Sequence, residues 1–169
     1  SKSKGNVVTP MGLLEEHGSD AVRYWAASAR LGTDAAFEVG QMKIGRRLAI
    51  KILNASKFAL SFSTDGTVSL DPALVTEDID KAMLAGLASV VERSTTALNE
   101  YDHTRALELT ETFFWTFCDD YLELVKDRAY ADGHDTVTPE ALSARTALAL
   151  ALDTLLRLFA PVLPFATDE

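Results

Sequence analysis

The strongest chemical pattern in this chain is a helical face that carries almost only cations. Apolar residues recur at three- and four-residue steps across 41–62, which predicts an amphipathic helix. At about 100° per residue, seven side chains fall within an arc of roughly 140°. They are Lys43, Arg46, Arg47, Lys51, Asn54, Lys57 and Phe58. Ile44, Leu48, Ile52, Ala55, Ala59 and Phe62 fall on the opposite side. No carboxylate occurs between Glu38 and Asp65 to neutralise these cations within the helix.

Such a face suits single-stranded nucleic acid. Cations follow the phosphates, and an aromatic ring on the same face stacks on an unstacked base. Phe58 is the residue that prompts this interpretation, because a large aromatic stands on the cationic side rather than the apolar side. The alternative is a solvated basic face that carboxylates of neighbouring helices partly neutralise, with Phe58 tucked under a loop. Composition and spacing leave both interpretations open.

Other residues offer weaker signals for chemistry. His17, His103 and His134 lie too far apart in sequence for the usual spacing of a metal site and have no cysteine partners, so no metal site is predicted. Cys118, the only cysteine, lies in an aromatic run and is expected to be a buried structural thiol. The acidic residues Asp119, Asp120 and Glu123 are expected to form a solvated helix face.

Composition sets the broad class. The chain has 169 residues, of which 47% are hydrophobic and 24% charged, typical of a folded domain with a real core. No apolar run approaches the roughly 20 residues of a membrane span. The net charge is −9, yet residues 1–60 hold nine Lys and Arg against five Asp and Glu, a balance of +4. A basic N-terminal third on an acidic body can steer an anion to one region.

The elements that must position the cationic face are nearly all helical. Capping residues, glycines and prolines predict helices over 10–17, 20–29, 39 or 41 to 62, 77–99, 103–131 and 138–163. Long amphipathic helices joined by short loops indicate an all-α, antiparallel up-down bundle. The short helices at the start are different, so we place a boundary near residue 38. Residues 1–37 are expected to form a small linking module and residues 38–169 the bundle.

The order of segments resembles a known family. Ser1-Lys2-Ser3-Lys4-Gly5 looks like the end of Lys-Met-Ser-Lys-Ser, the ATP-handling loop of class I aminoacyl-tRNA synthetases. The run 18–25 is similar to the segment after that loop in the valine, isoleucine and leucine group. The stretches 40–47, 54–58 and 117–126 resemble the valyl-tRNA synthetases, and 155–165 is similar to the helix that closes their anticodon domain.

The resemblance implies a piece of a larger ligase that activates valine with ATP and Mg²⁺ and transfers it to its tRNA. In this family the second lysine of the loop, here Lys2, stabilises charge on the departing phosphates, and Ser1 and Ser3 belong to the same ATP loop. The His-Ile-Gly-His-type motif and the nucleotide-binding sheet are absent from the sequence. We therefore expect no catalysis by this chain alone.

The resemblance also assigns the rest of the chain. Residues 1–37 would be the end of the ATP loop and a stem-contact module, and 38–169 most of a helical anticodon-binding domain. Lys51 and Phe58 would be the main anticodon contacts, with Phe58 stacking on a base, and Lys43, Arg46, Arg47, Asn54 and Lys57 would support them. Partners would be the valine tRNA and the upstream catalytic domain of the same chain, in a cytoplasmic and monomeric enzyme that contacts no membrane.

Two alternatives stay open at this point. The run Lys126-Asp127-Arg128-Ala129-Tyr130 also resembles the isoleucyl enzymes, although 54–58 would be out of character there. A helical module that binds a protein through its basic face is the other, and the first eight residues count against it.

Overall fold

The computed structural model describes residues 10–34, 37–63, 68–131 and 136–169, and in these ranges every regular element is helical. The α-helices are α1 (Pro10–His17), α2 (Ser19–Ala27), α3 (Val39–Leu60), α4 (Asp78–Asn99), α5 (His103–Thr116), α6 (Leu122–Tyr130), α7 (Pro139–Phe159) and α8 (Pro164–Asp168). A short 3-10 helix, η2 (Pro72–Leu74), precedes α4, and a π-helical segment, η3 (Phe117–Tyr121), joins α5 to α6. The predicted all-α class is confirmed.

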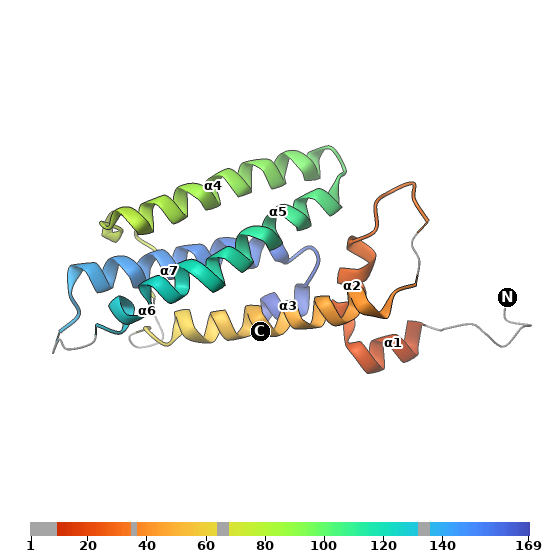
Figure 1. Ribbon diagram of the computed structural model, residues 1–169, viewed down its shortest axis with the longest axis horizontal. Coiled ribbons are helices and arrows are strands. Elements are labelled where there is room, and N and C mark those ends of the chain that lie inside the picture. Colours follow the sequence, from red (N-terminus) through yellow and green to blue (C-terminus); the bar gives the residue numbers. More distant parts are fainter. Residues whose placement is uncertain (1–9, 35–36, 64–67, 132–135) are drawn as a thin grey trace, which may run out of the picture.

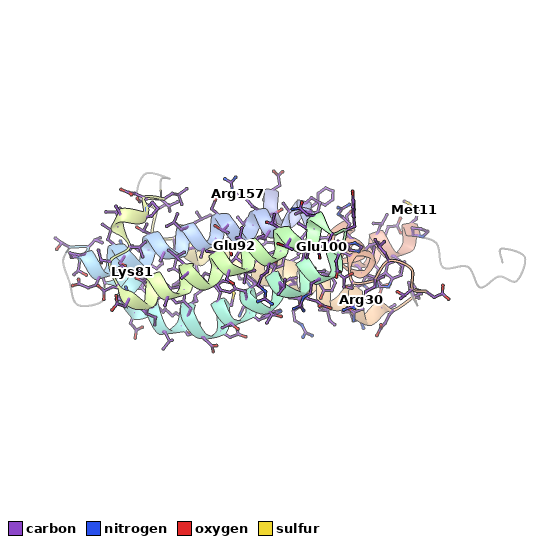
Figure 2. All side chains as sticks on the ribbon, turned by 90° about the horizontal axis from the view of Figure 1, so that it is seen from above. Met11, Arg30, Lys81, Glu92, Glu100 and Arg157 are labelled. Atoms are coloured by element: carbon purple, nitrogen blue, oxygen red, sulfur yellow. The ribbon has the colours of Figure 1, made fainter. Side chains whose placement is uncertain are left out.

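The long helices form a bundle along one axis. Figure 1 shows α4 and α5 on one side, α7 in the middle and α3 on the other side, with α1 and α2 at one end. Seen from above, Lys81 and Glu100 mark the two ends of α4, and Met11 and Arg30 lie at the end that carries α1 and α2 (Figure 2). This layout leaves one side of α3 uncovered by the bundle.

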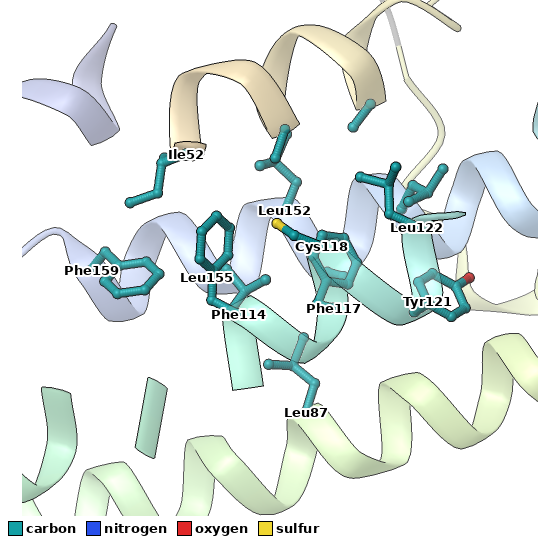
Figure 3. Close-up of a cluster of buried hydrophobic side chains, with 14 of the residues drawn as sticks. Ile52, Leu87, Phe114, Phe117, Cys118, Tyr121, Leu122, Leu152, Leu155 and Phe159 are labelled. Carbon is teal, nitrogen blue, oxygen red and sulfur yellow. The ribbon is translucent and has the colours of Figure 1, made fainter. Parts of the chain in front are cut away.

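The core forms where the apolar stripes of these helices meet. Ile52 of α3, Leu87 of α4, Phe114 of α5 and Phe159 of α7 are each at most 3% exposed, and Figure 3 shows them converging around the π segment. Phe114 and Phe159 meet edge to face with ring centroids 5.4 Å apart, an arrangement that aromatic pairs favour.

Sequence signals set the start of α7 as expected. Thr138 accepts a hydrogen bond on Oγ1 from the backbone N–H of Ala141 at 3.2 Å, and Pro139 occupies the first helical position. The hydroxyl satisfies a donor that the first helical turn leaves unpaired, and the proline ring costs nothing there.

The predicted single helix over 103–131 is wrong in one respect. Its backbone changes at Phe117–Tyr121 to a π-helical turn, which inserts one extra residue and rotates the side chains that follow. The predicted last helix also differs, since α7 ends at Phe159 and α8 begins at Pro164. A proline cannot donate to the preceding turn, so Pro161 and Pro164 enforce that break.

A buried carboxylate ties the π segment to two other helices. Asp80 of α4 is fully buried. It accepts hydrogen bonds from the Tyr121 hydroxyl at 2.8 Å, from both terminal nitrogens of Arg128 at 2.7 and 2.8 Å, and from Ser143 Oγ at 2.6 Å. Because the carboxylate is fully paired, the charge is tolerated in the core and fixes the register of α4, α6 and α7.

The N-terminal helices pack closely on α3. At Gly45 an added Cβ would stand 2.6 Å from Cβ of Tyr24, so only glycine lets α2 approach this far. Tyr24 donates to Glu111 Oε2 at 2.7 Å, and Arg23 donates to the carbonyls of Pro161 and Val162 at 2.7 and 3.1 Å. These contacts fix α2 against α3, α5 and the end of α7. The division of the chain at residue 38 stays a prediction.

Candidate nucleic-acid interface

Helix α3 presents the cationic face to solvent. Lys43, Arg46, Arg47, Asn54 and Lys57 are exposed, whereas Lys51 and Phe58 are half-buried. The buried side is formed by Met42, Gly45, Leu48, Ile52, Ala55 and Ala59. Ile44, expected on the apolar side, is 38% exposed. It stands at the edge of that side, and α2 packs on Gly45 instead.

A shallow groove runs between α3 and the π segment with α6. Its volume is about 260 Å³. Lys51, Asn54 and Phe58 line it from α3, and Cys118, Leu122 and Lys126 line it from the other wall. Three of the seven predicted contacts therefore share one hollow with an apolar floor, while Lys43, Arg46, Arg47 and Lys57 lie outside it on the same helix.

Lys51 has a carboxylate partner from another helix. Its Nζ stands 3.1 Å from Oδ1 of Asp119 and 5.8 Å from the ring centroid of Trp115. Glu123 and Lys126 form a second ion pair at the groove, at 3.6 Å. All four charged side chains are between 37% and 60% exposed. Water screens both ion pairs, so the attraction between the two charges of each pair is weak.

Phe58 belongs to an aromatic cluster at the end of the groove. Its ring meets Phe62 edge to face at 5.1 Å and Tyr130 at 5.8 Å, and the rings of Phe62 and Tyr130 stand 5.3 Å apart. Tyr130 is 48% exposed and is the open ring of the three. The cluster holds Phe58 in place with part of its surface facing the groove.

The other four cations of α3 differ in whether they have a partner within the protein. Arg46 donates from Nη1 to the carbonyl of Glu16 at 3.1 Å, which links α3 to the end of α1. Lys43, Arg47 and Lys57 make no ion pair or hydrogen bond with the described residues. These three cations can therefore meet an external anion without first losing an internal partner.

Comparison with known proteins decides the family. A family model described as the anticodon-binding domain of tRNA ligase matches residues 80–169, more than half of the chain. The chain belongs to this family of anticodon-binding domains. The matched residues run from α4 to α8 and include the wall of the groove that the π segment and α6 form. Helix α3, which forms the other wall, lies before the matched residues.

Relatives of this anticodon-binding domain match over its whole length. It is 67% identical over 169 residues to a valine–tRNA ligase of Thermobifida fusca (strain YX), and 64% identical over 169 residues to that of Salinispora tropica. All of this chain and 19% of each relative is covered, so it spans about a fifth of the curated relatives it matches.

A solved structure shares the fold. The agnB2 LeuRS–tRNA–LeuAMS ternary complex of Agrobacterium radiobacter K84 matches with a TM-score of 0.74 at 20% identity, covering 99% of this chain and 20% of that one. Because the likeness covers α1 and α2 as well as the bundle, the whole described architecture is that of this fold.

Cys118, on the floor of the groove, is buried as predicted. Burial raises the pKa of its thiol to about 12, so this part of the groove is neutral and unreactive.

The remaining predictions concern other parts of the anticodon-binding domain. Among the described residues, no three His, Cys, Asp or Glu side chains gather as metal ligands. None of the described helices is long and apolar enough to cross a membrane. Ser1, Lys2 and Ser3 lie outside the described residues.

Sequence reasoning missed one wall of the groove. Asp119 and Glu123 were expected to be a solvated acidic face, and Lys126 was not singled out. Both carboxylates are solvated as expected, at 60% and 59% exposure, and the pair of Asp119 with Lys51 is the partial neutralisation by a neighbouring segment that the alternative interpretation predicts. A helical wheel places residues on one helix only, so it could not identify Asp119 as the partner. Ile50, 50% exposed, also lies within the cationic arc and was overlooked there.

Proposed function

We propose that this chain is the anticodon-recognition part of a valine–tRNA ligase and binds the unpaired anticodon loop of valine tRNA at the α3 groove. The observation that carries the proposal is the match to valine–tRNA ligases over every residue, at 67% and 64% identity. In the whole ligase, valine would be activated with ATP and Mg²⁺ and transferred to tRNA, with Ser1, Lys2 and Ser3 in the ATP loop. That ligase would be a cytoplasmic monomer, and this chain would supply binding rather than chemistry.

The groove has the parts that single-stranded RNA needs. Arg47 and Lys57 lie outside it on the same helix as uncommitted cations for phosphates. Within it, Asn54 offers an amide for a base edge and Phe58 offers part of a ring for stacking. The groove's 260 Å³ is below the roughly 300–1,000 Å³ of small-molecule pockets. It therefore suits one flat group on a longer ligand.

The two alternatives make different demands. An isoleucyl enzyme would prefer isoleucine tRNA, but the relatives named above are valine–tRNA ligases. A protein-interaction module would use the same apolar floor, aromatic ring and cations, so only a binding measurement separates it from an RNA site. Both are outcomes of one experiment.

That experiment measures binding of this chain to the anticodon stem-loop of a valine tRNA, by fluorescence anisotropy over a series of salt concentrations. Arg47→Ala and Lys57→Ala should each reduce the slope of log affinity against log salt by about 0.7–0.9, as expected for each lost phosphate contact. Lys81→Ala is the matched control, because Lys81 is 56% exposed and lies on α4, on the opposite side of the bundle from α3 (Figure 1). It should leave the slope unchanged.

Three results would contradict the proposal. If all three variants keep the salt slope of the unmodified chain, the α3 face takes no part in binding. Tighter binding of an isoleucine stem-loop than of the valine stem-loop would favour the isoleucyl alternative. Absence of any salt-dependent binding to RNA would favour the protein-interaction module.

A further inference from the structure

Lys51 has an uncharged partner at the groove as well as a charged one. Its Nζ stands 5.8 Å from the ring centroid of Trp115, within the roughly 6 Å over which an aromatic ring attracts a cation. The charged partner is Asp119, whose Oδ1 is 3.1 Å from the same nitrogen. Trp115 is half-buried, packs against the core and does not line the groove. Any effect of its ring on a ligand in the groove therefore passes through Lys51.

The ring of Trp115 is itself held by a carboxylate one turn earlier on α5. Its indole Nε1 donates to Oε1 of Glu111 at 3.3 Å, and the other oxygen of Glu111 accepts from the Tyr24 hydroxyl at 2.7 Å. Tyr24 is buried and packs directly against Gly45 of α3, so its position is fixed. Glu111 thus connects a fixed residue of α2 with the ring beside Lys51.

The two partners of Lys51 differ in what happens to them when a phosphate arrives. The carboxylate of Asp119 competes with a phosphate for the ammonium group, because both are anions. The ring of Trp115 has no net charge, so its contact with Lys51 can persist beside a phosphate. Ordering a long side chain on binding costs free energy. A lysine that a ring already holds at the groove loses less freedom when the RNA binds.

We propose that Glu111 and Trp115 are positioning residues for Lys51 in RNA binding. Glu111 fixes the plane of the Trp115 ring, and the ring holds the ammonium group at the groove while a phosphate replaces Asp119. This inference rests on the proposed function, and it gives a role to two side chains that do not touch the RNA.

A double-mutant cycle tests the role of Trp115. Trp115→Leu should weaken affinity for the valine anticodon stem-loop about 2- to 5-fold, as for the loss of an exposed contact between a cation and a ring. In a chain that carries Lys51→Met, the same substitution should have no further effect, because the cation is gone. Phe113→Leu is the matched control and should leave affinity unchanged in both chains. Phe113 is a half-buried ring of the same helix, but it lines a hollow between α4 and α5.

Glu111→Gln tests the orienting step without changing the size of a side chain. An amide has one acceptor oxygen where a carboxylate has two, so the hydrogen bond from Tyr24 or from Trp115 is lost. Removing a negative charge from an RNA-binding protein favours binding in general, whereas loss of positioning should lower affinity. Glu108→Gln, the matched control, removes the same charge from an exposed residue of α5 and should give only a small gain. In the Lys51→Met chain, Glu111→Gln should also give only this gain.

A measurement without RNA follows the position of Lys51 itself. Protons close to the face of an aromatic ring resonate upfield in the NMR spectrum. The ε-methylene protons of Lys51 should therefore move downfield in Trp115→Leu and in Glu111→Gln. They should keep their shift in Phe113→Leu and Glu108→Gln.

The outcomes separate this inference from the proposed function. An equal loss of affinity from Trp115→Leu in the chains with and without Lys51→Met would mean that the ring is only structural, and would overturn the inference. A gain of affinity from Glu111→Gln in the chain that keeps Lys51 would also overturn it, and this sign decides if Trp115→Leu does not fold. Both results would leave the proposed function standing. Failure of the unmodified chain to bind the stem-loop would overturn the proposed function and this role in RNA binding together.

Discussion

The π segment separates two pairings of a carboxylate with a cation, one buried and one in water. Tyr121 points inward and donates to Asp80, which is fully buried and also bonded to Arg128 and Ser143. Two residues earlier in the same segment, Asp119 is 60% exposed and pairs with Lys51 at the groove. Two residues of one short segment therefore take part in a buried carboxylate cluster and in a solvent-exposed ion pair.

The difference shows how the chain divides structure from binding. Each oxygen of the buried Asp80 carboxylate accepts two hydrogen bonds, so this carboxylate holds helices together and is closed to a ligand. The Asp119–Lys51 pair is weak because water screens it, so an RNA phosphate can replace the carboxylate at low cost. The insertion of one π turn lets a single stretch of chain serve both purposes.

Removing the buried carboxylate should have the largest effect. Asp80→Ala leaves Arg128, only 24% exposed, without its partner and Tyr121 without its acceptor. We expect the free energy of unfolding to fall by about 3–5 kcal/mol, as when one partner of a buried pair is lost. Denaturant unfolding followed by circular dichroism measures it.

Asp153→Ala is the control for this comparison. Asp153 is 44% exposed and pairs with Arg157 one turn away, so its loss should cost less than about 1 kcal/mol. Equal losses for the two variants would mean that the Asp80 cluster is not held by its buried charge.

The pH dependence of stability should distinguish the two carboxylates next. Burial alone would raise the pKa of Asp80, but hydrogen bonds from Arg128, Ser143 and Tyr121 outweigh it, and the net pKa is lowered. A lowered folded pKa stabilises the protein above the unfolded value of about 3.9, and this contribution disappears as the pH falls through the folded pKa.

The measurement is the difference in unfolding free energy between the unmodified chain and Asp80→Asn from pH 7 to pH 3. The difference should be largest near neutral pH and should narrow below about pH 4. A gap that stays constant over this range would show that ionisation of Asp80 contributes nothing to the fold.

Much of this architecture was available from the sequence. Thr138 and Pro139 begin α7 as predicted, because capping is a local property of three or four residues. The burial of Leu48 and Ile52 followed from helical periodicity. The division of α3 into an apolar and a cationic side is a property of that helix alone, so its composition was sufficient to find it.

What the sequence did not reveal depends on contacts between distant segments. The π turn at Phe117–Tyr121 leaves the apolar spacing nearly unchanged, and the hydrogen bond from Tyr121 to Asp80 spans 41 positions. The partner of Lys51 is 68 positions away. The guanidinium of Arg145 stands 5.0 Å from the ring centroid of Phe62, and no periodic pattern relates these two residues. The groove could be predicted as a cationic face, but its second wall could not.

The smallest effect on stability, and the sharpest on binding, should come from the exposed carboxylate. Asp119→Asn removes a charge from the groove and frees Lys51, but the exposed pair is worth only roughly 0.2–1 kcal/mol, so unfolding should change by no more than that. Affinity for the valine anticodon stem-loop should rise by up to about fivefold, the binding equivalent of 1 kcal/mol. The gain should shrink as salt is added.

Asp120→Asn isolates the role of the pair from that of charge. Asp120 is also exposed and carries the same charge one residue along, but no ion pair joins it to a described cation. It should give only the smaller gain that comes from a less negative surface. If the two variants raise affinity equally, Lys51 is not restrained by Asp119. The ion pair at the groove would then differ from the Asp80–Arg128 pair only in its exposure to water, and Lys51 would be no easier for an RNA phosphate to bind.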